Sequence, residues 1–168
     1  MDEDYAVFSR TNKVSITPAG TVLKIAGEDF TRRGIRFSPA ESLEREGNFL
    51  ATLEGPHFPK VIKRGEGYLE TQFCGVRLGP HNLPADWHAQ VEEICGELRR
   101  HRIVHRDIKE GNLLVIDSTL VLIDFGWAFK WPWGFFLSPR ELSWDTNGPR
   151  IYSNRQSLLS LVRRISVS

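Results

Sequence analysis

The chain has 168 residues, of which 40% are hydrophobic and 26% are charged, and its formal net charge is +1. This balance is typical of a folded domain and excludes a wholly disordered chain. The near-zero net charge offers no argument for a nucleic acid, a membrane surface or an acidic partner. The length suffices for one compact domain or for two small lobes that share a cleft.

We expect neither a targeting signal nor a transmembrane segment. The opening MDEDYAVFSR is acidic, unlike a signal peptide. The longest apolar region, LLVIDSTLVLIDFGWAF, is interrupted by Asp117 and Asp124, which excludes a membrane span. Cys74 and Cys95 lack metal-site spacing and cannot form a disulfide framework, so we expect buried, unreactive thiols. These features predict a cytoplasmic protein.

The first third of the chain predicts strands around one helix. The β-rich runs 14–17 and 21–25 flank Pro-Ala-Gly, which indicates a hairpin. A helix should begin at Ser38, a good N-cap that is followed by Pro39, and should end at Gly55-Pro56. A second hairpin is predicted around the segment 64–67, Arg-Gly-Glu-Gly.

The remainder predicts a loop, two helices and a tight hairpin. The segment 74–84 reads as a loop and as a boundary between two lobes. It is followed by an amphipathic helix over 84–103, whose apolar residues recur at helical spacing. Two short buried strands, 113–116 and 120–123, are separated by the turn Asp-Ser-Thr. A last amphipathic helix is predicted over 153–165.

Three polar residues around the predicted tight hairpin suggest phosphoryl transfer. This chemistry needs an acidic residue near the acceptor hydroxyl, ligands for Mg²⁺ and a cation on the phosphates. Asp107 and Asn112 precede the first strand, and Asp124 follows the second. A hairpin brings Asn112 and Asp124 to the same end, and their oxygen atoms are the hard ligands that Mg²⁺ prefers. In the alternative interpretation the two aspartates merely cap turns.

This segment resembles the catalytic region of the protein-kinase-like superfamily. The pattern H-R-D-x-K-x-x-N is present from His105 to Asn112, and D-F-G is present from Asp124 to Gly126. The resemblance implies that Asp107 is the catalytic base or orients the acceptor hydroxyl, and that Lys109 is a cation near the transferred phosphate. Asn112 and Asp124 would hold Mg²⁺. His105 and Phe125 would pack together, and Arg106 would anchor the loop beyond Asp124.

The resemblance also implies an upstream ATP-binding lobe. The strand TVLKI would supply Lys24 for the α- and β-phosphates, with Glu46 of the following helix as its ion-pair partner. Glu41 and Glu44 compete with Glu46 for this role. Gln72, Phe73 and Cys74 would form the hinge whose backbone binds adenine, unless they are an ordinary strand that runs into a loop.

The chain departs from the kinase pattern in two places. No G-x-G-x-x-G precedes the strand lysine, as is also the case in RIO kinases and lipopolysaccharide-core kinases, and the segment 9–13 is the candidate phosphate-covering turn. Few residues follow Asp124-Phe125-Gly126, and Asn154 stands where kinases usually have an aspartate. The aromatic segment Trp127–Leu137 either fills the space of absent helices or forms a surface for a partner protein, a sugar or a lipid headgroup. The basic residues at 150, 155, 163 and 164 are interpreted as a solvated face.

The sequence therefore predicts an α+β, bilobal protein-kinase-like fold. Residues 1–73 would form an N-lobe of antiparallel strands and one helix, and residues 74–168 a reduced, mainly helical C-lobe. The predicted activity is ATP- and Mg²⁺-dependent phosphorylation of a hydroxyl, first on protein Ser/Thr and second on a small molecule or glycan. The alternative is a nucleotide-binding pseudokinase or ATPase module within a partner complex.

Overall fold

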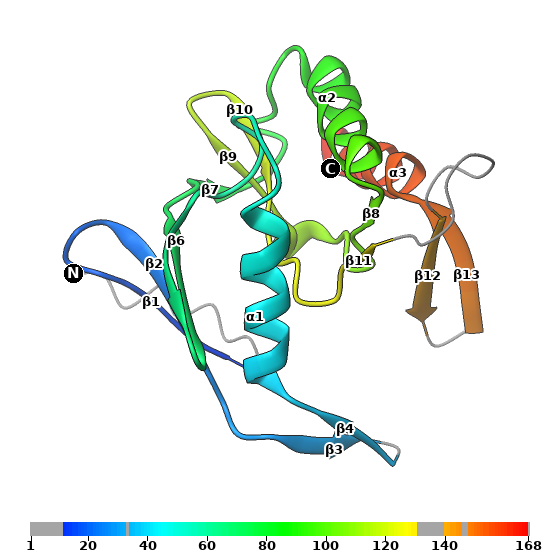
Figure 1. The fold of residues 1–168 in the computed structure, drawn as a ribbon. Helices are drawn as coiled ribbons and strands as arrows, with labels where there is room; N and C mark the ends of the chain where they lie inside the picture. Colours follow the sequence, from blue (N-terminus) through cyan, green and yellow to red (C-terminus); the bar gives the residue numbers. More distant parts are fainter. Residues whose placement is uncertain (1–11, 33, 131–139, 146–147, 168) are drawn as a thin grey trace.

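The computed structural model describes residues 12–32, 34–130, 140–145 and 148–167. These residues form a mixed α+β fold in which every strand pairing is antiparallel, as predicted. The helices of the described residues are α1 (Pro39–Leu50), α2 (Trp87–Arg100) and α3 (Asn154–Ser166), with a short 3₁₀ turn at Glu110–Asn112. In Figure 1, α1 stands beside a twisted sheet, while α2 and α3 lie together at the far end of the molecule.

The largest sheet has the strand order β1-β2-β6-β5. Both predicted hairpins are confirmed, since β1 pairs with β2 and β5 pairs with β6. Gly20 adopts a φ of 74° in the first turn, a conformation that glycine tolerates without steric cost. Lys24 lies opposite the fully buried Leu69 on the face that α1 covers. The strands are β1 (Asn12–Ile16), β2 (Thr21–Ala26), β5 (Val61–Gly65) and β6 (Tyr68–Gln72).

Helix α1 begins as predicted but ends earlier. The Ser38 hydroxyl accepts a hydrogen bond from the Glu41 backbone N–H at 3.5 Å, and Pro39 occupies the first turn. The predicted end at Gly55-Pro56 is wrong, because the helix stops at Leu50. Both the backbone N–H and the hydroxyl of Thr52 bond to the Phe49 carbonyl, and these local bonds replace the next helical turn.

An unpredicted hairpin leads directly into α1. Its strands are β3 (Phe30–Arg32) and β4 (Ile35–Phe37), and Gly34 adopts a φ of 76° between them. Figure 1 shows this hairpin projecting from the first turn of α1. The strands are too short to carry an alternating apolar pattern, which is why the sequence did not reveal them.

A second sheet contains the predicted tight hairpin. Strand β9 (Leu113–Ile116) pairs with β10 (Thr119–Leu122) through the two-residue turn Asp117-Ser118, in which both φ angles are positive. This turn moves the start of the second strand to residue 119, one residue earlier than predicted. The predicted loop 74–84 contains strand β7 (Val76–Arg77), which pairs with β9. A Cβ atom at Gly75 would lie 2.0 Å from the Val115 carbonyl oxygen, so only glycine permits this close approach.

Helices α2 and α3 pack against the second sheet around the main core. The predicted helices are confirmed at these positions, and α2 has a fully buried apolar side. Strand β8 (Ile103–Val104) pairs with β11 (Phe129–Lys130), and the hairpin of β12 (Arg140–Asp145) and β13 (Gly148–Ser153) leads into α3. The core includes Val91, Ile94, Leu98, Leu113, Leu120, Leu122, Phe125, Leu158, Leu161 and Val162.

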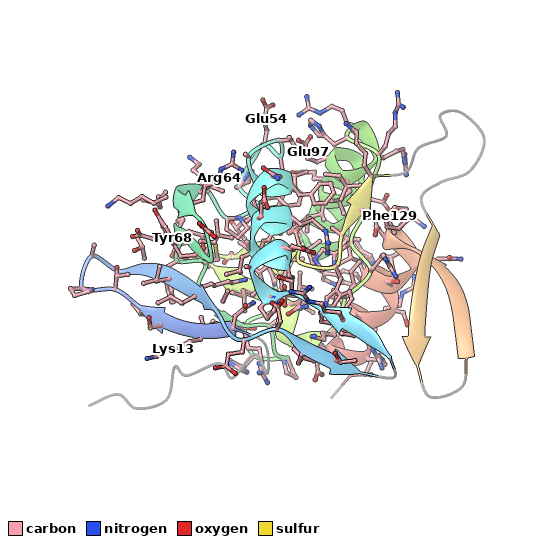
Figure 2. The ribbon with its side chains drawn as sticks, turned by 60° about the horizontal axis from the view of Figure 1, so that its bottom comes forward. Lys13, Glu54, Arg64, Tyr68, Glu97 and Phe129 are labelled. Atoms are coloured by element: carbon pink, nitrogen blue, oxygen red, sulfur yellow. The ribbon has the colours of Figure 1, made fainter. Side chains whose placement is uncertain are left out.

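A polar cluster ties the end of α1 to α2. The backbone N–H of Glu54 donates to the Glu97 carboxylate at 2.9 Å. Arg100 pairs with both carboxylates, at 3.0 Å to Glu54 and 2.8 Å to Glu97. Figure 2 labels Glu54 and Glu97. The C-terminal side of α1 is thus fastened to α2, with Leu50 buried in the shared core.

Some predicted features lie outside the described residues. Of the aromatic segment Trp127–Leu137, the residues from 131 onward are not described, so the structure does not test its proposed roles. Of the candidate turn 9–13, only Asn12 and Lys13 are described, and they belong to strand β1 (Figure 2). Among the described helices, none combines the length and the apolar character that crossing a bilayer requires.

Candidate functional site

The strand lysine and the helix glutamate form a buried ion pair. The Lys24 Nζ atom lies 2.7 Å and 2.9 Å from the two carboxylate oxygens of Glu46. The side chains are 13% and 2% exposed, so water weakens the attraction little. Glu41 and Glu44, the competing candidates, are exposed. Only Glu46 shares the buried side of α1 with Leu43 and Leu50, at helical spacings of three and four.

A second carboxylate acts on the same lysine. Burial by itself would lower the pKa of the Lys24 ammonium, but the charges of Glu46 and then Asp124 outweigh it and raise this pKa above its ordinary value. The structure thus brings Asp124, one hundred positions along the chain, into the electrostatic field of the Lys24–Glu46 pair. Lys24 is held as a cation at any physiological pH.

The segment 105–112 gathers two polar side chains around one carboxylate oxygen of Asp107. Lys109 Nζ lies 2.6 Å from Asp107 Oδ2, and Asn112 Nδ2 donates to the same oxygen at 2.9 Å. Asn112 Nδ2 also donates to the Asp107 backbone carbonyl at 2.8 Å. The Asp107 side chain remains 23% exposed. These bonds orient the carboxylate and occupy Oδ2, so Oδ1 is the oxygen that can accept another proton donor.

Asp124 lies beside Asn112 in an unusual backbone conformation. The backbone N–H of Ile123 donates to the Asn112 carbonyl at 3.0 Å, which aligns the two segments. Asp124 adopts a φ of 66°, a left-handed conformation that is uncommon outside glycine and often occurs at functional sites. Within the described part of the chain, no group donates a hydrogen bond to its half-buried carboxylate. Both oxygens are therefore available to a ligand.

The donor set of Asn112 and Asp124 fits a magnesium ion. The amide nitrogen of Asn112 is committed to Asp107, which leaves its Oδ1 as a hard oxygen donor. Asp124 adds carboxylate oxygens. The described residues contain no cluster of three or more His, Cys, Asp or Glu side chains that could hold a metal alone. Such a sparse set suits Mg²⁺, which keeps water ligands and shares phosphate oxygens with its protein ligands.

A buried histidine supports the two acidic segments. His105 Nε2 donates to the Ile123 carbonyl at 3.0 Å, and Nδ1 accepts the Asp107 backbone N–H at 3.2 Å. Its ring meets Phe125 edge to face, with centroids 4.6 Å apart. Burial lowers the pKa of His105, more than Asp124 and the Ile123 hydrogen bond raise it, so the ring is neutral. The residue connects the backbones on either side of the site.

The candidate hinge connects the two sheets. Gln72 ends β6, with its backbone N–H bonded to the Lys60 carbonyl, and Phe73 follows it. The Cys74 thiol is buried and donates to the Gln72 carbonyl at 3.3 Å. Burial raises the pKa of Cys74 to about 11, against a smaller opposing effect of Lys24. The thiol is thus unreactive, as expected from the sequence.

Two contacts that the sequence did not reveal join α1 to the loop after Asp124. Arg45 donates to the Gly126 carbonyl at 2.7 Å. A Cβ atom at Gly126 would lie 2.3 Å from the Ser42 hydroxyl oxygen, so a larger residue here would require that hydroxyl to rotate away. Arg106, beyond these contacts, places its guanidinium 5.5 Å from the Phe129 ring centroid. For the Arg45–Gly126 contact, the sequence offered one signal, namely that Arg45 stands next to Glu46.

No protein-family model matches the chain. Comparison with curated proteins finds similarity to protein kinases. The chain is 31% identical over 151 residues to a carbon catabolite-derepressing protein kinase of Candida tropicalis, covering 81% of this chain and 24% of the relative. It is 27% identical over 145 residues to human mitogen-activated protein kinase kinase kinase 4, covering 73% of this chain and 9% of the relative. An Aurora kinase of Candida glabrata is 27% identical over 115 residues, with 60% and 32% coverage.

Proposed function

This chain belongs to the protein-kinase-like superfamily, and on that premise we propose that it is an ATP- and Mg²⁺-dependent phosphotransferase. The chain spans only part of the length of these relatives, 24% of the Candida tropicalis kinase and 9% of the human one. In our proposal residues 1–73 act as the nucleotide-binding lobe and residues 74–168 as the catalytic lobe.

The observation that supports the proposal best is the meeting of three charged groups from distant segments. Lys24 pairs with Glu46 at 2.7 Å, and the charge of Asp124 helps to raise the pKa of that same lysine. A cation, an ion-pair partner and a free carboxylate next to each other suit a nucleotide polyphosphate with its metal. A turn-capping role for Asp124 would instead require a hydrogen bond to its carboxylate.

Each residue receives a defined role in this proposal. Lys24 binds the α- and β-phosphates, and Glu46 holds its ammonium in place. Asn112 and Asp124 would hold Mg²⁺, which would neutralise charge on the phosphates. The hinge residues Gln72, Phe73 and Cys74 bind adenine through their backbone groups.

The acceptor hydroxyl would lie next to Asp107. Oδ1 is the free oxygen of this carboxylate, because Oδ2 already accepts bonds from Lys109 and Asn112. Asp107 would therefore orient the hydroxyl through Oδ1 and accept its proton, while Lys109 compensates charge on the transferred phosphoryl group. We propose protein Ser/Thr as the acceptor, because the relatives named above are protein kinases and Lys109 follows the pattern of Ser/Thr kinases.

The proposal is tested with γ-labelled ATP, Mg²⁺ and a Ser/Thr peptide library. We compare the wild type with Asp107→Asn, Asp124→Asn and the control Asp117→Asn, which changes an exposed turn aspartate. Asp107→Asn should reduce phosphate transfer by about 10²-fold or more while leaving ATP binding intact. Asp124→Asn should weaken ATP binding in the presence of Mg²⁺, and Asp117→Asn should change neither property.

The outcome also separates a kinase from a binding module. ATP binding by the wild type without transfer to itself, to the library or to water would contradict the proposal and indicate a nucleotide-binding module. Release of ADP without labelled peptide would indicate an ATPase.

A further inference from the structure

Three aromatic side chains join the β3–β4 hairpin to the loop after Asp124. Phe30 and Phe37 stack with ring centroids 5.2 Å apart and planes at 15°. Phe37 meets Trp127 edge to face, with centroids 5.4 Å apart and planes at 65°. We call Phe30, Phe37 and Trp127 the aromatic clasp. Because Phe30 is 37% and Trp127 44% exposed, the clasp is a surface contact between two elements and not part of the core.

The clasp lies next to the first turn of helix α1. Only Ser38 separates Phe37 from Pro39, the first residue of the helix, so a movement of the Phe37 ring carries the first turn with it. The opposite end of α1 is fastened to α2 and buried at Leu50. Glu46 lies between the two ends. A displacement of the first turn would therefore change the angle at which Glu46 meets its lysine.

On one side, the first turns of α1 border a cavity. A cavity of about 440 Å³ lies between the hairpin, the first turns of α1 and the loop after Asp124. Its lining includes the clasp residues together with Ser42, Arg45 and Phe129. On the side of the cavity the helix start is held by the clasp and the Arg45–Gly126 hydrogen bond, while Pro39 and Leu43 are buried. Small changes in these contacts can therefore shift the helix.

We propose that the aromatic clasp is a positioning device that keeps Glu46 paired with Lys24, with Phe37 as its central residue. The expected effect on nucleotide binding rests on the proposed function. The expected movement of α1 rests on the geometry alone. An edge-to-face aromatic pair contributes a factor of about 2 to 13 to an equilibrium constant beyond its buried area. Loss of the Trp127 ring should therefore change, by a factor in this range, the equilibrium constant between the observed and the displaced position of α1.

Hydrogen–deuterium exchange of the full chain without nucleotide tests the movement. In Trp127→Ala and Phe37→Ala, peptides that cover residues 30–46 should exchange faster by about 2- to 13-fold, while Trp127→Phe should restore most of the protection. Tyr68→Ala, which removes a similarly exposed aromatic ring from β6, should not change the exchange of residues 30–46. Unchanged exchange in Trp127→Ala, or an equal increase over α2 that signals general destabilisation, would overturn the proposal.

Calorimetric binding of Mg²⁺–ATP tests the link to Glu46. Trp127→Ala should weaken binding by about 2- to 13-fold in the wild-type background and by less than about twofold in the Glu46→Gln background, where the ion pair is already lost. The same loss in both backgrounds would show that Trp127 does not act through Glu46 and would overturn this part. If the wild type binds no ATP, the proposed function fails, and the exchange experiment alone decides whether the clasp positions α1.

Discussion

The amide of Asn154 carries two hydrogen bonds that a carboxylate cannot both make. Asn154 is the first residue of α3 and is 5% exposed. Its Oδ1 accepts the His105 backbone N–H at 3.1 Å, and its Nδ2 donates to the Ile103 carbonyl at 2.8 Å. The side chain thereby joins α3 to both ends of the segment that leads into Asp107. Kinases usually have an aspartate here, which makes Asn154→Asp an informative substitution.

We predict that Asn154→Asp destabilises the chain at neutral pH. The change keeps the bond from His105 but leaves the Ile103 carbonyl facing a carboxylate oxygen. An unsatisfied buried acceptor costs about 1–3 kcal/mol, and the buried charge adds to this, so we expect a loss of about 2–4 kcal/mol. The protonated acid can donate to Ile103, so the folded variant retains its proton to a higher pH than the unfolded chain does. The difference from wild type should therefore shrink as the pH falls.

Urea denaturation at pH 7 and pH 5 measures this effect as a difference in the free energy of unfolding from wild type at each pH. Asn48→Asp, a change of the same chemistry at an exposed position of α1, should remain within about 0.5 kcal/mol of wild type. The reasoning would be refuted if Asn154→Asp were as stable as wild type at pH 7. It would also be refuted if its deficit were independent of pH.

Three further predictions concern buried groups. Burial raises the pKa of Cys74 to about 11 and that of Cys95 to about 12. A disulfide reagent at pH 8 should therefore label neither thiol until the protein unfolds. Rapid labelling of the native protein would contradict this prediction. Because burial lowers the pKa of His105, the unfolded chain binds a proton that the folded chain rejects, and stability should fall as the pH drops below about 6.5. His105→Phe should flatten the dependence of the free energy of unfolding on pH between 7 and 5, and equal slopes would count against the neutral ring. Gly75→Ala should lower the free energy of unfolding by at least about 2 kcal/mol more than Gly55→Ala does, as measured by thermal or urea unfolding. Both positions have positive φ, but only the methyl group at position 75 would meet a carbonyl oxygen, at 2.0 Å. Equal losses in the two variants would contradict the clash.

The sequence by itself determined the elements whose signals are local. Ser38 and Pro39 define the start of α1, because a hydroxyl cap and a fixed φ act within one turn. The β1–β2 and β5–β6 hairpins followed from glycine-containing turns between β-rich runs. The pattern from His105 to Gly126 was sufficient to recognise the superfamily, since its residue types and spacing are held in one continuous segment. Glu46 was preferred over Glu41 and Glu44 because the segment that follows it resembles the kinase pattern.

Only the tertiary structure decided the features for which residue type along the chain gives no signal, most of all the contacts between distant segments. The end of α1 at Leu50, the strand after Gly75 and the β3–β4 hairpin arise from local hydrogen bonds or close packing that residue type alone does not predict. The Arg45–Gly126 bond and the two hydrogen bonds of Asn154 join residues 81 and about 50 positions apart. Sequence patterns report which residues share one face of an element. Which face meets which partner is decided by the packing of the whole chain, and that packing brings Asp124 to Lys24.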